Sequence, residues 1–216
     1  MRAARSPAAK RRAVSRSSRT GRSTLPAASN ASRTAKGRAS AAVPIDAWVR
    51  SSVWKSLPKD ITVAKPDTVI YQITTYDWGS TQEQQAGYER LLSTVTAAGA
   101  KLVIVTMPPI KPDDFYRPHL KDLKHAAQSA QTVADASHGQ AVVLDASQVW
   151  GATYQRIRDG KTDRSSDGIH TCPQGAARFT SWLLDEMTKI YPAFTPPTAT
   201  KWANTGWAGD KRFIGC

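Results

Sequence analysis

The stretch "KLVIVTMPP" (residues 101–109) decides the fold class of this chain. A lysine is followed by an unbroken run of branched apolar residues, and two prolines end it, a pattern typical of a strand buried on both faces. Two similar runs lie on either side of it in the sequence, "DTVIYQIT" at 67–74 and "AVVLDAS" at 141–147. The sequence therefore predicts three buried strands.

Helical patterns separate these predicted strands. Apolar residues recur at helical spacing in 80–99, which starts with a capping serine or threonine, and again in 119–139. A last helix is predicted at 173–190, where Pro173 suits the first helical position. Strands that alternate with helices need crossover connections, and these produce a parallel sheet covered by helices on both faces. We therefore expect a three-layer α/β/α fold.

Composition divides the rest of the chain. Residues 1–44 hold eleven Lys or Arg and no acidic residue, whereas the remainder carries 19 basic and 17 acidic residues. Residues 1–44 are predicted to be disordered because they contain too little apolar surface to offset the entropy lost on ordering. The α/β domain is expected at 45–190, and its first helix, at 46–57, is predicted to stop at Pro58. A tail rich in Pro, Gly and Trp, 191–216, is expected to pack back on the domain.

The basic segment allows three interpretations. A nucleic-acid-binding arm needs this charge, an Arg- and Ser-rich transit peptide has a similar composition, and a misplaced start in GC-rich DNA would yield such residues without any function. We favour the last. We do not expect nucleic acid as a partner, because no aromatic residue stands among the arginines to stack on bases. No apolar run reaches the roughly 18 residues of a transmembrane helix, and no secretory signal is evident.

The two cysteines, Cys172 and Cys216, leave two alternatives open. One disulfide would tie the C-terminal end to the segment after His170 if the protein is extracytoplasmic, and otherwise two free thiols are expected. Cys172 is a poor candidate for a nucleophile beside His170, because neighbours in sequence need not be hydrogen-bonded in space.

Polar residues follow the predicted strands at the ends where open parallel sheets bind ligands. Asp77 follows the first strand, Thr106 ends the second, and Asp145 ends the third, where it is expected to cap the next turn. Asp167 and His170 precede the last helix. We expect all of these side chains to gather at one edge of the sheet.

Asp167 and His170 have the spacing of a general base and its orienting carboxylate. A catalytic histidine presents one ring nitrogen to the nucleophile, while an acceptor holds the other nitrogen and fixes the tautomer. In a tight turn, a carboxylate three residues earlier can reach that second nitrogen. The alternative is a turn aspartate beside an incidental histidine.

The order of these motifs resembles the SGNH or GDSL-type hydrolases over about residues 46–216. The motifs are "YDWG", "TMPP", "LDAS" and "DGIH", and they are most similar to the SGNH domains of actinobacterial envelope proteins and of membrane acyltransferases. The resemblance implies a flavodoxin-like sheet and a Ser-His-Asp triad with His170 as base and Asp167 as its partner. It also implies O-acyl groups of carbohydrate or lipid as substrate, no cofactor, and an extracytoplasmic or secreted location.

The chain departs from this family at the nucleophile. The family's serine lies in a G-D-S turn, which this sequence lacks. None of the serines near the N-terminus follows an apolar strand: Ser40, Ser51 and Ser52. The family's oxyanion-binding Gly and Asn correspond to Thr74 and Tyr76, so that only Asp77 of this block matches. We expect a truncated domain without its front strands, which would leave 67–74 as an unpaired edge; an inactive, repurposed fold is the alternative.

Asp77, Tyr76 and Trp78 are our candidates for substrate binding. The two aromatic residues would either contact an acyl or sugar group at the sheet edge or pack under the tail. Three histidines lack the i, i+4 pairing of a zinc helix and are expected to be solvated: His119, His125 and His138. We accordingly expect no metal site.

Two functions follow from the sequence. The first is an SGNH-type ester hydrolase or acyl-transfer domain for a small-molecule or glycan ester, inactive if the nucleophile block is lost. The alternative is a non-catalytic envelope domain that binds a glycan or a protein partner. The oligomeric state stays open.

Overall fold

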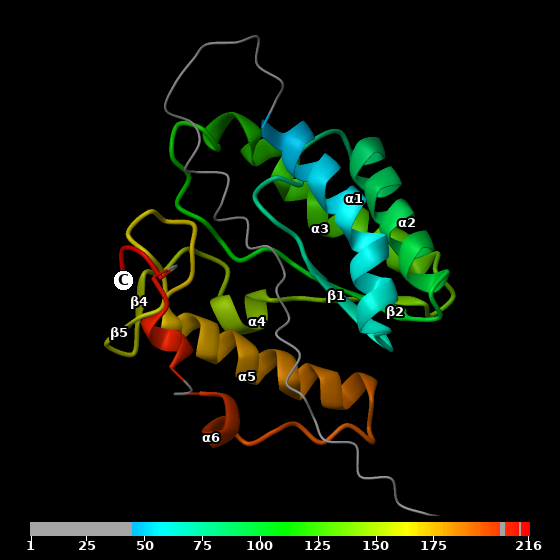
Figure 1. Cartoon of the computed structure of the whole chain (residues 1–216). Coiled ribbons are helices and arrows are strands. Elements are labelled where there is room, and N and C mark those ends of the chain that lie inside the picture. The colour runs from blue at the N-terminus through cyan, green and yellow to red at the C-terminus, as the bar shows by residue number, and fades with distance from the viewer. Residues whose placement is uncertain (1–44, 204–205, 212) are drawn as a thin grey trace, which may run out of the picture. The chain divides into compact units, whose positions relative to one another are not determined.

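The computed structural model describes residues 45–203, 206–211 and 213–216, and the segment 1–44 for which we predict disorder lies outside them. A parallel sheet in the order β1-β2-β3 forms the centre. Its strands are β1 (Thr68–Gln72), β2 (Lys101–Val105) and β3 (Ala141–Leu144). One face carries α1 (Ile45–Ala64), α2 (Thr81–Thr96) and α3 (Leu120–Asp135), and the other carries α4 (Ser147–Trp150) and α5 (Pro173–Ile190) (Figure 1). The expected three-layer α/β class is confirmed.

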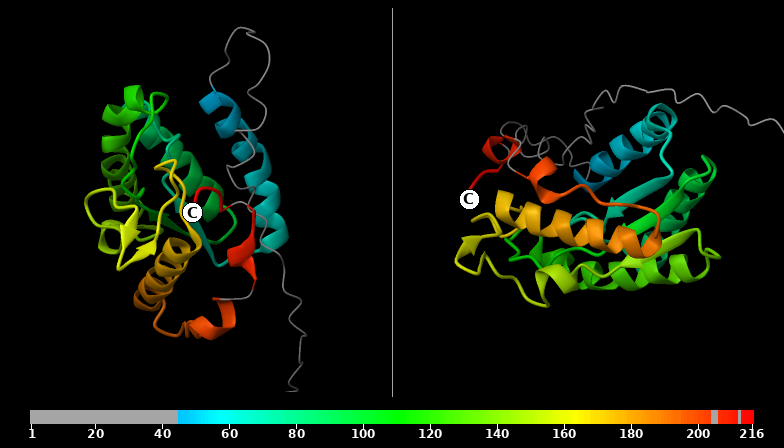
Figure 2. Two further views of the ribbon diagram at one scale, coloured as in Figure 1. Left: turned by 90° about the vertical axis from the view of Figure 1, so that its left-hand side faces the viewer. Right: turned by 90° about the horizontal axis from the view of Figure 1, so that it is seen from below.

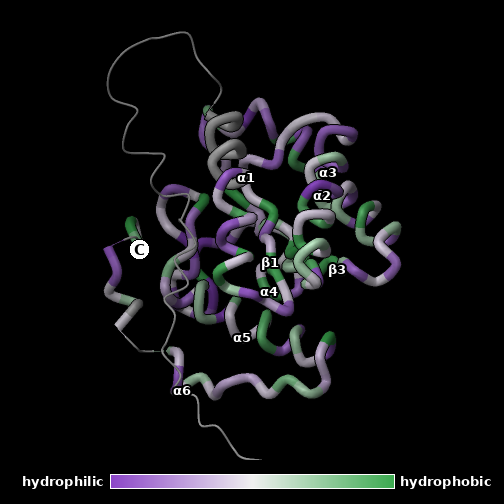
Figure 3. Tube along the Cα trace, turned by 45° about the vertical axis from the view of Figure 1, so that its right-hand side comes forward, coloured by the Kyte–Doolittle hydropathy of each residue, from purple (hydrophilic) through white to green (hydrophobic). Residues whose placement is uncertain are grey.

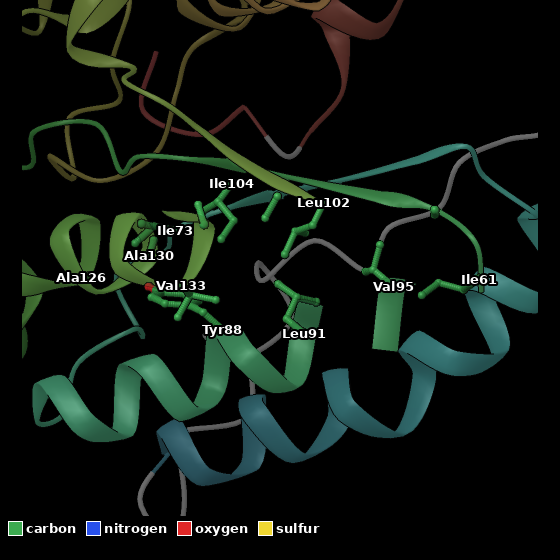
Figure 4. Close-up of a cluster of buried hydrophobic side chains, with 13 residues drawn as sticks. Ile61, Ile73, Tyr88, Leu91, Val95, Leu102, Ile104, Ala126, Ala130 and Val133 are labelled. Carbon is green, nitrogen blue, oxygen red and sulfur yellow. The ribbon is translucent and has the colours of Figure 1, made fainter. Parts of the chain in front are cut away.

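The residues of β2 show why both outer layers form. Leu102 and Ile104 pack into the cluster shared with α2 and α3, which Figure 4 shows beneath the sheet. Val103 and Val105 face the opposite way, into the cluster that α4 and α5 cover. Alternate residues of a strand point to opposite faces, and each fully buried side chain of this kind contributes about 1.5–3 kcal/mol. A strand that is apolar at every position therefore needs helices on both sides.

The connections between the strands place two helices on one face. Adjacent parallel strands joined by right-handed crossovers in one direction carry their crossover helices on the same side, and α2 and α3 do pack against each other. Ser80 starts α2 through a capping box with Glu83. The second face is covered only after β3, by α4 and α5 (Figure 2).

Helix α1 is longer than expected, because Pro58 does not end it. A proline removes one backbone hydrogen bond but holds a φ compatible with a helix. The residues beyond it gain enough packing to continue the helix, since Ile61 is buried in the main cluster and Leu57 packs against that cluster. Thr62 also donates to the carbonyl oxygen of Pro58.

A hairpin that the sequence analysis did not predict lies between α4 and α5. Its strands are β4 (Ile157–Arg158) and β5 (Lys161–Thr162). Asp159 and Gly160 between them both have positive φ, the geometry of a two-residue type I′ turn. The short elements that remain are η2 (Arg117–His119), α6 (Ala199–Trp202) and η3 (Trp207–Gly209).

Hydrophobic segments gather around the strands and α4 (Figure 3). Among the helices that the structure describes, none is both long enough and apolar enough to cross a bilayer.

Candidate active site

Asp167 and His170 meet in the turn that leads into α5. Oδ2 of Asp167 lies 2.7 Å from Nδ1 of His170, and Oδ1 accepts hydrogen bonds from the backbone N–H groups of Ile169 at 2.8 Å and His170 at 2.9 Å. Gly168 between them has a φ of 78°, which a glycine adopts without strain. The two side chains are thus brought together in the geometry that their spacing indicates.

The surroundings of Asp167 favour its charged form. Burial alone would raise the pKa of its carboxyl, but the hydrogen bonds from the backbone and ring of His170 and from the backbone of Ile169 outweigh burial and lower the pKa. An ionised Asp167 accepts a hydrogen bond from the N–H at Nδ1, so that Nε2 of His170 is left as the basic nitrogen. The His170 side chain is 56% exposed, and solvent can therefore reach it.

The segment after β2 holds this turn at the carboxyl edge of the sheet. Lys111 donates its backbone N–H to the carbonyl oxygen of Gly168 at 3.0 Å. A Cβ at position 168 would lie 2.5 Å from the carbonyl oxygen of Lys111, so only glycine fits this approach. The dyad consequently lies where open parallel sheets place their ligands.

The C-terminal end holds the same turn from its other side. Cys172 and Cys216 form a disulfide, which is the first of the two alternatives left open by the sequence. Ser165 donates its hydroxyl to the carbonyl oxygen of Ile214 at 2.6 Å, and Ser166 donates its N–H to that of Gly215 at 2.9 Å. Both ends of this turn (residues 165–172, hereafter the dyad turn) are therefore bonded to the last residues of the chain.

Asp77 has different partners. Its carboxylate accepts hydrogen bonds from the hydroxyls of Tyr71 on β1 at 2.8 Å and Tyr88 on α2 at 3.1 Å, and from Thr74. Burial nevertheless raises the pKa of Asp77, because it outweighs the hydrogen bonds from these hydroxyls. These contacts support a role in tying strand to helix, and contact with a substrate stays a prediction for Asp77.

Tyr76 and Trp78 belong to a ring cluster, which we define as Tyr76, Trp78, Phe115, Tyr116 and His119. The indole of Trp78 stacks on the His119 ring at 3.8 Å and has Phe115 at its edge, 5.9 Å away. Trp78 is 9% exposed and Phe115 is 44% exposed. Burial is the main cause that raises the pKa of Tyr76. The segment after β2 therefore covers Trp78 and leaves Phe115 at the surface.

The other candidates divide between exposed and structural positions. His125 and His138 are exposed, as expected, whereas His119 is not simply solvated because it stacks on Trp78. Asp145 caps the turn after β3 by accepting from the backbone N–H of Ser147 at 2.9 Å, which confirms that prediction. Within the described residues no group of three His, Cys, Asp or Glu side chains could hold a metal ion.

Two further features lie away from the dyad. Among the serines considered as nucleophiles, two lie within α1 and one lies outside the described residues: Ser51, Ser52 and Ser40.

A small hollow of about 30 Å³ is lined by the first residues of β2 and β3 and by the end of α5. It lies at the amino edge of the sheet, opposite to the dyad.

Fold and site together define an α/β protein with a parallel sheet and an aspartate–histidine pair at the sheet's carboxyl edge. No family model and no curated protein matches the chain. Among solved structures, it is similar to a mutant of an acetyl-xylooligosaccharide esterase from Geobacillus, with a TM-score of 0.49, 13% identity, and coverage of 67% of this chain and 68% of that one. It is also similar to a peptidoglycan O-acetylesterase, with a TM-score of 0.43, 13% identity, and coverage of 70% of this chain but only 45% of that one. Both TM-scores lie below 0.5, and the chemistry of the site is therefore inferred from the geometry of the Asp167–His170 dyad alone.

Proposed function

We propose that this protein is an ester hydrolase or acyl-transfer domain of SGNH type, acting on O-acyl groups of carbohydrate or lipid. The observation that carries the proposal is the 2.7 Å contact between Asp167 and Nδ1 of His170, at the edge of the sheet where ligands bind. The disulfide supports an extracytoplasmic location, because disulfides persist in oxidising compartments.

The dyad supplies general acid–base chemistry. Nε2 of His170 takes the proton from a hydroxyl as that hydroxyl attacks the ester carbonyl, and then returns the proton to the departing alkoxide. Asp167 stabilises the imidazolium that forms between the two steps. The attacking hydroxyl belongs to water or to a serine outside the dyad turn.

The test is ester turnover by the full chain, with p-nitrophenyl acetate as the probe and His170→Ala as the variant. General acid–base catalysis contributes about 100-fold to 10,000-fold, so we expect at least a 100-fold loss of the rate above background. His125→Ala is the matched control, because this histidine is exposed on α3 and should not affect the rate. Equal rates for the wild type and His170→Ala would contradict the proposal.

The ring cluster favours a second candidate, a non-catalytic domain that binds a glycan. Phe115 exposes 44% of its surface beside the hydroxyls of Tyr76 and Tyr116, which lie 3.4 Å apart. An aromatic surface with polar groups at its edge suits a sugar, which has an apolar face and a rim of hydroxyls. In the first candidate, the same cluster would hold the sugar part of the ester.

Affinity electrophoresis in gels that contain acetylated xylan or soluble peptidoglycan tests this second candidate. We expect Phe115→Ala to abolish retardation of the protein. Phe194→Ala is the matched control, since Phe194 is a tail phenylalanine with 38% exposure. Unchanged mobility of the wild type in both gels would rule out binding at this surface, and hydrolysis in the ester assay together with binding would favour the first candidate.

A further inference from the structure

Arg164 is a buried cation, and within the part of the chain that the structure describes it forms no ion pair with a carboxylate. Arg164 is 2% exposed. The neighbouring Asp163 pairs instead with Arg178, whose Nε lies 2.9 Å from Oδ2 of Asp163. Burying a charge costs several kcal/mol unless its N–H groups find acceptors. The contacts of this guanidinium should therefore indicate its role.

The guanidinium of Arg164 joins two loops. Nη1 donates to the carbonyl oxygen of Pro109 at 2.9 Å, and Nη2 donates to that of Ile169 at 2.7 Å. Pro109 follows β2, and Ile169 lies within the dyad turn, directly before His170. The guanidinium thus links the dyad turn to the segment after β2, close to the place where Lys111 bonds Gly168.

Two aromatic rings lie close to this group. The guanidinium carbon lies 5.3 Å from the ring centroid of Trp150 in α4 and 5.4 Å from that of Tyr154. Both distances are within the range of a cation–π contact. An arginine presents its N–H groups in a rigid fork, whereas a lysine presents one flexible ammonium. The site therefore uses a property that is specific to arginine.

We infer that Arg164 is a positioning residue for the dyad. By donating to the carbonyl oxygen of Ile169, it sets the backbone of the turn so that Nδ1 of His170 meets Oδ2 of Asp167. Burial lowers the pKa of the Arg164 guanidinium, and the negative charge of Asp167 partly opposes this shift. The catalytic meaning of this role rests on the proposed function, but the positioning itself can be measured without any turnover.

The proton on Nδ1 of His170 provides the measurement. In the full chain, a hydrogen-bonded ring proton gives a strongly downfield NMR resonance, and its loss in His170→Ala assigns it. We expect the resonance in the wild type, its loss in Arg164→Met, and a weakened resonance in Arg164→Lys, which keeps the charge but only part of the fork.

Arg178→Met is the matched control. Arg178 pairs with Asp159 and Asp163 and makes none of the bonds to Pro109 or Ile169. We expect this variant to keep the resonance even where its melting temperature falls. A purely structural role for Arg164 predicts the opposite, a lower melting temperature with the resonance intact, and that result would overturn the inference.

Two outcomes need separate readings. If Arg164→Met does not fold, Arg164→Lys decides the question, and an unchanged resonance in a folded Arg164→Lys overturns the inference. If the wild type shows the resonance but no ester turnover, the loss in Arg164→Met still supports positioning, while the proposed hydrolase function fails.

Discussion

Two aspartates at the carboxyl edge of the sheet have opposite surroundings. Asp77 accepts hydrogen bonds from tyrosine and threonine side chains within the packed layers, and burial raises its pKa. Asp167 accepts hydrogen bonds from backbone N–H groups and from an imidazole, and its pKa is lowered although burial opposes this. The first arrangement connects elements of the fold, and the second prepares a histidine to accept a proton.

The two turns are also held by different forces. The Asp77 turn follows β1 directly and is fixed by hydroxyls of β1 and α2, both part of the main core. The Asp167 turn lies in a long connection between β5 and α5 and contains few large apolar side chains. It is held by the disulfide, by Arg164 and by the C-terminal residues. The comparison shows that a site at a loop needs covalent and polar links where core packing is absent.

Removing the disulfide should have the largest effect. The Cys172→Ser and Cys216→Ser double variant should lose about 2–4 kcal/mol of unfolding free energy, the usual range for a bridge that closes a loop of this size. Hydrogen exchange should rise in 163–172, next to the bridge, and stay unchanged around Asp77. Uniform exchange in both turns would break the comparison, because it would mean that the bridge does not act locally.

Deleting each carboxylate should separate the two roles. Asp77→Ala removes the carboxylate that accepts hydrogen bonds from the hydroxyls of Tyr71 and Tyr88, so we expect a loss of about 2–3 kcal/mol in urea denaturation. Asp167→Ala should cost less than about 1 kcal/mol, because the pair is half exposed. Asp167→Ala should instead remove the downfield ring proton of His170.

Tyr88→Phe sharpens this test, because it removes one donor and leaves the carboxylate in place. We expect a loss of about 1 kcal/mol, close to the value of a single hydrogen bond. If Asp167→Ala proved more destabilising than Asp77→Ala, the assignment of roles would be reversed.

The smallest expected effect is on the pH dependence of stability. A carboxyl whose pKa is lower in the folded state stabilises the folded protein at pH values above its unfolded pKa of about 4, and this contribution disappears as the pH falls through the folded pKa. A carboxyl whose pKa is raised in the folded state has the opposite effect. The free-energy difference between wild type and Asp167→Asn should therefore grow from about pH 3 to pH 6, by a fraction of a kcal/mol for an exposed pair.

For Asp77→Asn the sign is reversed. The wild type should lose stability relative to this variant as the pH rises above the unfolded value, because a buried carboxylate must then be ionised or keep its proton. Urea titrations at several pH values measure both differences. Parallel pH profiles for the two variants would show that the surroundings of the two carboxyls do not differ as described.

Much of the fold was predictable from local patterns. The apolar runs located the strands, Ser80 and Pro173 located the starts of α2 and α5, and the D-x-x-H spacing located the dyad. The hairpin at Asp159 and Gly160 was missed although its dipeptide is a known turn signal. The predicted end of α1 was wrong, because the free energy gained by burying Ile61 outweighs the helix destabilisation caused by Pro58. This burial is not visible in a local pattern.

The sequence by itself determined which residues alternate between faces of the sheet and which aspartate could orient a histidine base, because both depend on spacings of a few residues. Only the tertiary structure decided that Arg164 bonds the dyad turn to the segment after β2, that His119 stacks on Trp78, and that Cys216 bonds to Cys172. Each of these contacts joins residues whose spacing in the chain says nothing of their separation in space. They form because packing of the core brings loop ends together, and polar groups that become buried there are retained where they can form hydrogen bonds with one another.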